Sequence, residues 1–91
     1  MNRADALFNW LQSKVLSDAR PGDRAAAETR EFFEDLLRRD HRVDHLEVTV
    51  DERMYTVRFV AGGQRGLQRF DREAVEQLLR DVMELEKPVR D

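Results

Sequence analysis

Apolar residues recur at helical spacing in three stretches of the chain. Positions i, i+3, i+4 and i+7 share one face of a helix, so each stretch predicts an amphipathic helix. The predicted helices span residues 2–17, 24–40 and 72–86. Their core-facing stripes are Ala4, Leu7, Phe8, Leu11 and Val15; Ala25, Ala26, Thr29, Phe32, Phe33, Leu36 and Leu37; and Val75, Leu78, Leu79, Val82 and Leu85.

Short polar residues stand just before each predicted helix. Asn2, Asp23 and Asp71 are suitable N-caps, because their side-chain oxygens can accept hydrogen bonds from free N–H groups of the first turn. Between the first two helices, Pro21 and Gly22 suit the centre of a type II turn, since proline presets φ and glycine accepts positive φ.

Apolar and polar residues alternate with a period of two in the middle of the chain, which is typical of half-buried strands. This pattern predicts strands over 43–51 and 53–61, joined by a tight turn at Asp51-Glu52. Residues 62–66 are rich in glycine and predict a loop. Residues 67–70 are expected to form a short third strand at the edge of the sheet.

These elements define an α+β fold in a single small domain over residues 1–91. The order is α-α-β-β-β-α, and consecutive hairpins make the sheet a three-stranded antiparallel meander. Because one face of such a sheet must be covered, we expect the helices to pack on that face.

Composition narrows the function classes. Hydrophobic residues make up 41% of the chain and charged residues 38%, so a core can form beneath a densely charged surface. The net charge of −3 argues against a general polyanion binder, which would carry a basic excess. Without cysteine, disulfides and thiolate metal sites are excluded. The chain has no apolar run of membrane length, and we expect a soluble, cytoplasmic protein without a cofactor.

The stretch 40–45 holds two histidines and two aspartates. His41 and His45 have the spacing that two ligands need on one helix, but the helix is predicted to end near Asp40, so the spacing loses that meaning. A metal-dependent or hydrolytic enzyme centred on His41, Asp44 and His45 would carry bound metal after purification. We expect neither a metal nor catalysis, because no nucleophile elbow or phosphate-binding loop is present.

An arginine cluster supports a second function class. Arg53, Arg58, Arg65 and Arg69 lie on or near the predicted meander, and helix, three strands, helix is also the order of the double-stranded RNA-binding domain. However, the last helix starts with acidic residues where that domain uses lysines against phosphate. A nucleic-acid-binding module is therefore the alternative hypothesis, and nucleic acid is an unlikely partner.

Large apolar residues outside the predicted stripes favour a different partner. Tryptophan and methionine are enriched at the cores of interfaces. We therefore predict a non-catalytic protein-interaction module of adaptor or regulatory type, which binds a protein partner or a second copy of itself. It would dock through the first helix or through the open sheet face. The candidate interaction residues are Trp10, Leu16, Met54, Arg58 and Met83.

Overall fold

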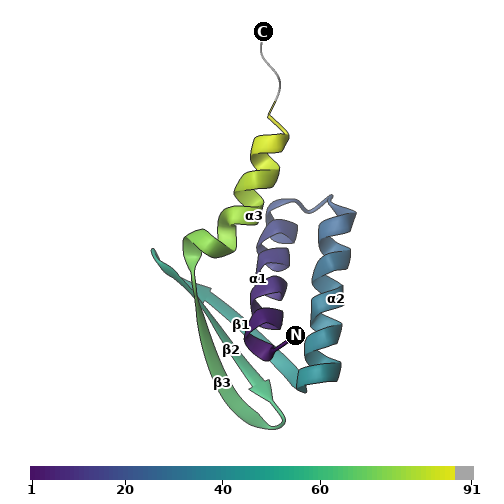
Figure 1. Cartoon of the computed structure of the whole chain (residues 1–91), viewed down its shortest axis with the longest axis vertical. Helices are drawn as coiled ribbons and strands as arrows, with labels where there is room; N and C mark the ends of the chain where they lie inside the picture. The colour runs from purple at the N-terminus through teal and green to yellow at the C-terminus, as the bar shows by residue number, and fades with distance from the viewer. Residues whose placement is uncertain (88–91) are drawn as a thin grey trace.

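Three helices and a three-stranded antiparallel sheet form in the order predicted from the sequence (Figure 1). The computed structural model describes residues 1–87. The elements are α1 Arg3–Ala19, α2 Arg24–His41, β1 Val43–Val50, β2 Met54–Ala61, β3 Gln64–Asp71 and α3 Arg72–Leu85. The sheet is a meander in the order β1-β2-β3. The predicted α+β class is confirmed.

All three predicted N-caps are confirmed. Asn2 Oδ1 accepts a hydrogen bond from the Asp5 N–H at 2.8 Å, and Asp23 Oδ1 accepts one from the Ala26 N–H at 3.1 Å. The Ala26 N–H, followed by Arg20, holds the pKa of the Asp23 carboxyl below its usual range. Asp71 Oδ2 accepts from the Ala74 N–H at 2.9 Å. Because Asp71 is also the last residue of β3, α3 starts without any connecting loop.

The α1–α2 turn is not of type II. The Asp23 N–H donates to the Arg20 carbonyl at 2.9 Å, which closes a turn around Pro21 and Gly22. A type II turn needs positive φ at Gly22, and only Gly62 and Gly63 among the described glycines have it. The prediction at this turn is therefore wrong in type, although its position is correct.

The third strand is longer than predicted. Gly62 and Gly63 have φ of 57° and 81°, which are the values of a two-residue type I′ hairpin turn. The rest of the predicted loop joins the sheet, and β3 extends over eight residues. Cross-strand pairing with β2 determines this strand, since Gln64, Arg65 and Gly66 show no apolar alternation.

The β1–β2 turn forms without glycine. Asp51 Oδ1 accepts hydrogen bonds from the N–H groups of Arg53 and Met54, both at 2.8 Å. These two backbone donors are the main reason that the pKa of the Asp51 carboxyl is lowered. The turn therefore includes Arg53, and β2 begins one residue later than predicted, at Met54.

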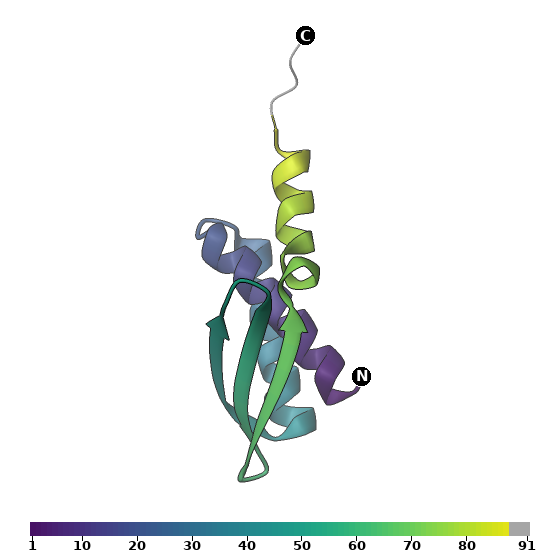
Figure 2. The same ribbon diagram turned by 90° about the vertical axis from the view of Figure 1, so that its left-hand side faces the viewer.

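The core lies between the inner face of the sheet and α1. Tyr55, Val57 and Phe59 of β2 point inward and are 8%, 0% and 4% exposed. Leu7 and Leu11 of α1 are fully buried in the same cluster. Helix α2 lies beside α1 on the same side of the sheet, and Figure 2 shows both helices behind the strands. Only α1 and α2 form the predicted covering layer, because α3 continues beyond the end of β3 (Figures 1 and 2).

Candidate interaction surfaces

Two of the predicted interaction residues belong to the core. Trp10 is 3% exposed and Leu16 is 9% exposed. The Trp10 indole N–H donates to Glu34 Oε1 of α2 at 3.1 Å, so its polar atom also has its partner inside the chain. The expectation that these two side chains point away from the core is wrong. Because α1 packs against both α2 and α3 as well as the sheet, its buried arc is wider than its stripe.

The reverse holds for α3, whose apolar stripe is covered only in part. Two of its members are partly buried, namely Leu79 and Val82. Val75 is fully buried, but Leu78 is 36% exposed and Leu85 is 85% exposed. Met83, the predicted interaction residue on this helix, is 55% exposed. The part of α3 that projects past the sheet therefore presents apolar side chains to solvent. Sequence reasoning assigned this stripe to the core, and the helical period alone could not show that it lacks a neighbour.

Polar contacts fix the base of α3. The Tyr55 hydroxyl donates to Glu76 Oε2 at 2.6 Å, and Arg72 Nε donates to the same oxygen at 3.0 Å. Burial, and then the hydrogen bond to Glu76, raises the pKa of Tyr55 to about 12. Arg72 also donates to the Asp51 carbonyl at 2.9 Å. The direction of the helix is thus set by contacts at its first turns.

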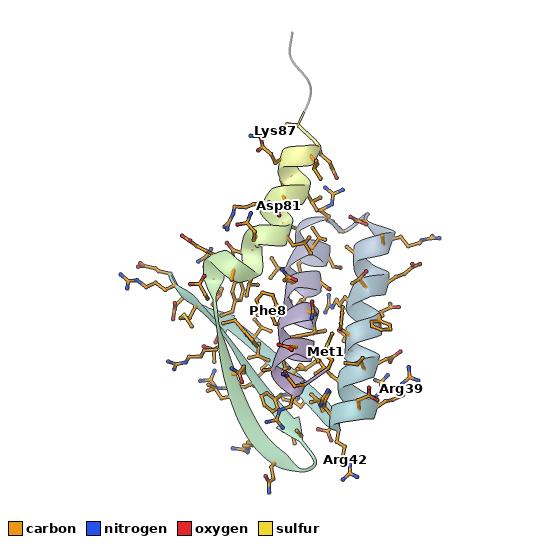
Figure 3. All side chains as sticks on the ribbon, viewed as in Figure 1. Met1, Phe8, Arg39, Arg42, Asp81 and Lys87 are labelled. Carbon is orange, nitrogen blue, oxygen red and sulfur yellow. The ribbon has the colours of Figure 1, made fainter. Side chains whose placement is uncertain are left out.

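A second contact lies near the end of α3, where Arg20 donates to Glu86 Oε2 at 2.8 Å. Phe8 of α1 packs on Phe70, the residue before the N-cap, with the ring centroids 5.6 Å apart. Phe8 lies between α1 and the base of α3 in Figure 3. Contacts near both ends therefore fix the position of the projecting helix and of its exposed leucines.

An open groove borders α3 on one side. It has a volume of about 540 Å³ and lies between the second half of α1, the end of β1 and α3. Val50 at its edge is 50% exposed, although it belongs to the inner face of the sheet. The apolar residues of the groove are Leu11, Val15, Ala19, Val48, Val50 and Leu79.

The outer face of the sheet is the second uncovered surface. Arg58 stands at its centre, opposite Glu47 on β1 and Leu67 on β3. Arg65 and Arg69 lie two residues to either side of Leu67 and therefore share this face. Leu67 is 48% exposed, and a hollow of about 640 Å³ lies over this part of the face.

The arginines of this face have no close acidic partner. Within residues 1–87, no carboxylate lies within 4.0 Å of Arg58, Arg65 or Arg69. Glu47 lies 3.7 Å from His45 instead. Arg69 is near enough to contribute to the lowered pKa of Asp51. Among the described residues, the face thus combines an exposed leucine with three arginines that form no ion pair within 4.0 Å.

The predicted site residues do not form one site. Met54 and Arg58 share the outer face of β2, as predicted from the alternation. Met83 lies on α3 beside the α1–α2 turn. Arg53, expected in the arginine cluster, is placed in the β1–β2 turn.

The histidine-rich stretch is divided between two elements. His41 is the last residue of α2, whereas Asp44 and His45 belong to β1, next to an irregularity in its pairing with β2. Among residues 1–87, no group of three or more histidine, aspartate or glutamate side chains is arranged to hold a metal ion. In the same part of the chain, no helix has the length and apolar character needed to cross a bilayer.

Comparison with protein-family models, with curated proteins and with solved structures finds no match to this chain. The function must therefore be argued from the two uncovered surfaces.

Proposed function

We propose that this chain is a non-catalytic protein-interaction module whose docking element is the projecting part of α3. The observation that carries the proposal is the exposure of two leucines on the α3 stripe, Leu78 at 36% and Leu85 at 85%. Burying one such side chain contributes about 1.5–3 kcal/mol relative to leaving it in water. A partner that covers both leucines would gain a substantial part of its binding free energy there.

The surroundings of the helix support docking over accidental exposure. Single exposed apolar residues are common on protein surfaces. Here Leu78 and Leu85 follow one stripe of a helix that is held at its base by Glu76 and near its end by Glu86. A preorganised helix loses little conformational freedom when a partner binds it. A cytoplasmic setting belongs to the same proposal, because a chain without cysteine does not depend on an oxidising compartment.

Affinity capture with a variant pair tests the proposal. The tagged wild-type chain and a Leu78→Glu, Leu85→Glu variant are compared, each with and without nuclease. Phe32→Glu on α2 is the matched control, because Phe32 is 59% exposed but lies on a different helix. We expect wild type and control to retain the same protein, self or other, and the α3 variant to lose it. A folded α3 variant that retains every partner would overturn the proposal.

The arginines of the outer sheet face favour one other function, the binding of nucleic acid. Arg58, Arg65 and Arg69 could contact successive phosphates, and such binding weakens steeply with salt. Against it, Glu47 lies on the same face, and no aromatic ring of β1, β2 or β3 is there for bases to stack on. Recovery of partners that collapses after nuclease treatment would promote this alternative.

A further inference from the structure

We infer that the partner is a second copy of this chain, and that α3 of one copy docks on the outer sheet face of the other. This inference rests on the function proposed above and names its partner. It follows from the complementarity of the two uncovered surfaces, one leucine-rich and acidic, the other leucine-centred and basic.

The donor surface is the exposed side of α3. Leu78 and Leu85 are seven residues apart, and Asp81 stands three residues after the first and four before the second, so all three share one side of the helix. The side chain of Asp81 accepts a hydrogen bond from Gln77 at 2.7 Å, and no basic side chain of residues 1–87 lies within 4.0 Å of it. Asp81 lies on the projecting part of α3 (Figure 3). This side therefore offers leucines together with an uncompensated negative charge.

The acceptor surface carries the opposite charge around its own leucine. Leu67 is 48% exposed and is surrounded by Arg58 across the strand pair and by Arg65 and Arg69 along β3. A helix laid over Leu67 would bring its leucines onto an apolar centre and its carboxylate toward guanidinium groups. Arginine suits this role because its planar head can bind a carboxylate through two hydrogen bonds.

The dimensions of the two surfaces agree. The part of α3 with exposed leucines, residues 78–85, is about 12 Å long at ~1.5 Å per residue, so it fits along one strand. Strand β3 has eight residues and is about 27 Å long at ~3.4 Å per residue. Helix α3 cannot dock on the outer sheet face of its own chain, because it points away from its own sheet beyond the strand ends (Figure 2). The contact must therefore be made between molecules.

A two-fold arrangement lets each copy donate its α3 and accept the helix of the other, so that the assembly closes as a dimer. A helix segment about 12 Å long and ~10 Å wide covers roughly 120 Å². Each copy contributes one helix segment and one sheet face, or roughly 240 Å² in projection, against ~800 Å² per partner in a standard interface. We therefore expect a weak dimer, with a Kd of about 10 μM or higher.

A complementation experiment tests this contact. The helix variant is Leu78→Glu with Leu85→Glu, and the sheet variant is Arg65→Glu with Leu67→Glu. These side chains are all exposed, so both variants should fold, which circular dichroism checks. Sedimentation velocity over a range of concentrations measures the dimer. We expect each variant alone to dimerise at least about tenfold more weakly than wild type. The helix variant loses the burial of two leucines, and the sheet variant loses a charge contact.

An equimolar mixture of the two variants gives the discriminating result. The intact α3 of the sheet variant can dock on the intact sheet face of the helix variant, so the mixed dimer keeps one of its two contacts. We expect it to form more weakly than the wild-type dimer and more strongly than the homodimer of either variant. If the sheet variant dimerises as wild type does, or if mixing restores nothing, the inference is wrong, because copies that met helix to helix would behave in that way.

The remaining outcomes separate the inference from the proposed function. A wild-type chain that stays monomeric but captures another protein through α3 overturns the inference and leaves the proposed function standing. A monomer that captures nothing through α3 overturns both. A fluorescent RNA oligonucleotide that binds wild type and helix variant, but not the sheet variant, would assign the arginine face to nucleic acid and overturn the inference.

Discussion

Substitution of Gly66 by alanine should destabilise the fold through one identifiable contact. Gly66 of β3 pairs with Phe59 of β2, and the phenyl ring lies over the glycine. A Cβ added at position 66 would stand 2.4 Å from Phe59 Cε2 and Cζ, far inside van der Waals contact. The ring has little room to retreat, because Phe59 is 4% exposed and the Arg3 guanidinium lies 4.8 Å from its centroid.

The magnitude follows from two opposing effects. Extra volume in a packed core typically costs about 1–3 kcal/mol. Replacing glycine by alanine also restricts the unfolded chain, which stabilises the fold by ~0.4–1 kcal/mol. We therefore expect Gly66→Ala to lower the free energy of unfolding by about 1–2 kcal/mol. In a domain of this size, each kcal/mol lowers Tm by ~4–8 °C.

Two further substitutions isolate the clash. Gly22→Ala is the matched control, since a Cβ there meets nothing within 4 Å and the backbone φ is not positive. It should leave stability unchanged or raise it by up to ~1 kcal/mol. Phe59→Leu removes the ring atoms that a Cβ at Gly66 would meet. On that background, Gly66→Ala should cost less than about 0.5 kcal/mol. The difference between its costs on the two backgrounds, about 0.5–2 kcal/mol, is the coupling energy expected of residues in direct contact.

Urea unfolding gives the free energies of unfolding of wild type and of the four variants, with the fluorescence of the single tryptophan, Trp10, as the signal. Trp10 is 3% exposed in the folded chain, so its emission should shift when the core opens. A Gly66→Ala chain as stable as Gly22→Ala would show that the added Cβ meets no obstacle. An equal cost of Gly66→Ala with phenylalanine and with leucine at position 59 would show that the ring is not the cause.

Three other measurements test the contacts that hold the helices. Tyr55 is the only tyrosine, so its pKa of about 12, raised chiefly by burial, can be followed by tyrosinate absorbance. Because the pKa of Tyr55 is higher in the folded than in the unfolded chain, the stability that its protonated hydroxyl contributes is present below about pH 10 and is lost as the pH rises toward 12. A folded chain whose tyrosine titrates near pH 10 would contradict this. Trp10→Ala should cost about 3–5 kcal/mol, and Trp10→Phe, which loses mainly the hydrogen bond to Glu34, about 1–2 kcal/mol, both measured by circular dichroism in urea. Val75→Ala should lower the free energy of unfolding by about 2 kcal/mol because the side chain is fully buried. Leu85→Ala, at a side chain that is 85% exposed, should change it by less than about 0.5 kcal/mol. Equal effects of the two substitutions would show that α3 packs differently.

The features predicted correctly from the sequence depend on local chemistry. An aspartate before a helical stripe caps it wherever the helix packs, and Asp71 accepts the expected hydrogen bond from the Ala74 N–H. The alternation over residues 54–61 likewise fixes which side chains share a face, so that Met54 and Arg58 point opposite to Tyr55. Both follow from neighbours only a few residues apart.

The third strand could not be predicted from the same rules. Gln64, Arg65 and Gly66 have neither the alternation nor the side chains of a strand. They are extended because Gly62 and Gly63 close a type I′ turn and bring them beside β2, where the backbone groups pair. Gly66 itself is explained only by the ring of Phe59, which lies seven residues earlier in the chain.

The candidate site shows why position relative to a stripe is a poor guide to exposure. Trp10 lies off the stripe of α1 yet is buried, because α2 adds a second neighbour and Glu34 supplies an acceptor for its indole N–H. Leu85 lies on the stripe of α3 yet is almost fully exposed, because the helix runs past the end of the sheet that would have covered it. The apolar stripe indicates which side of a helix is apolar, whereas the extent of its contact with neighbouring elements decides how much of that side is buried. Helix α3 packs mainly on α1 and has few contacts with β2 and β3, so Leu78 and Leu85 remain exposed and are the residues to mutate.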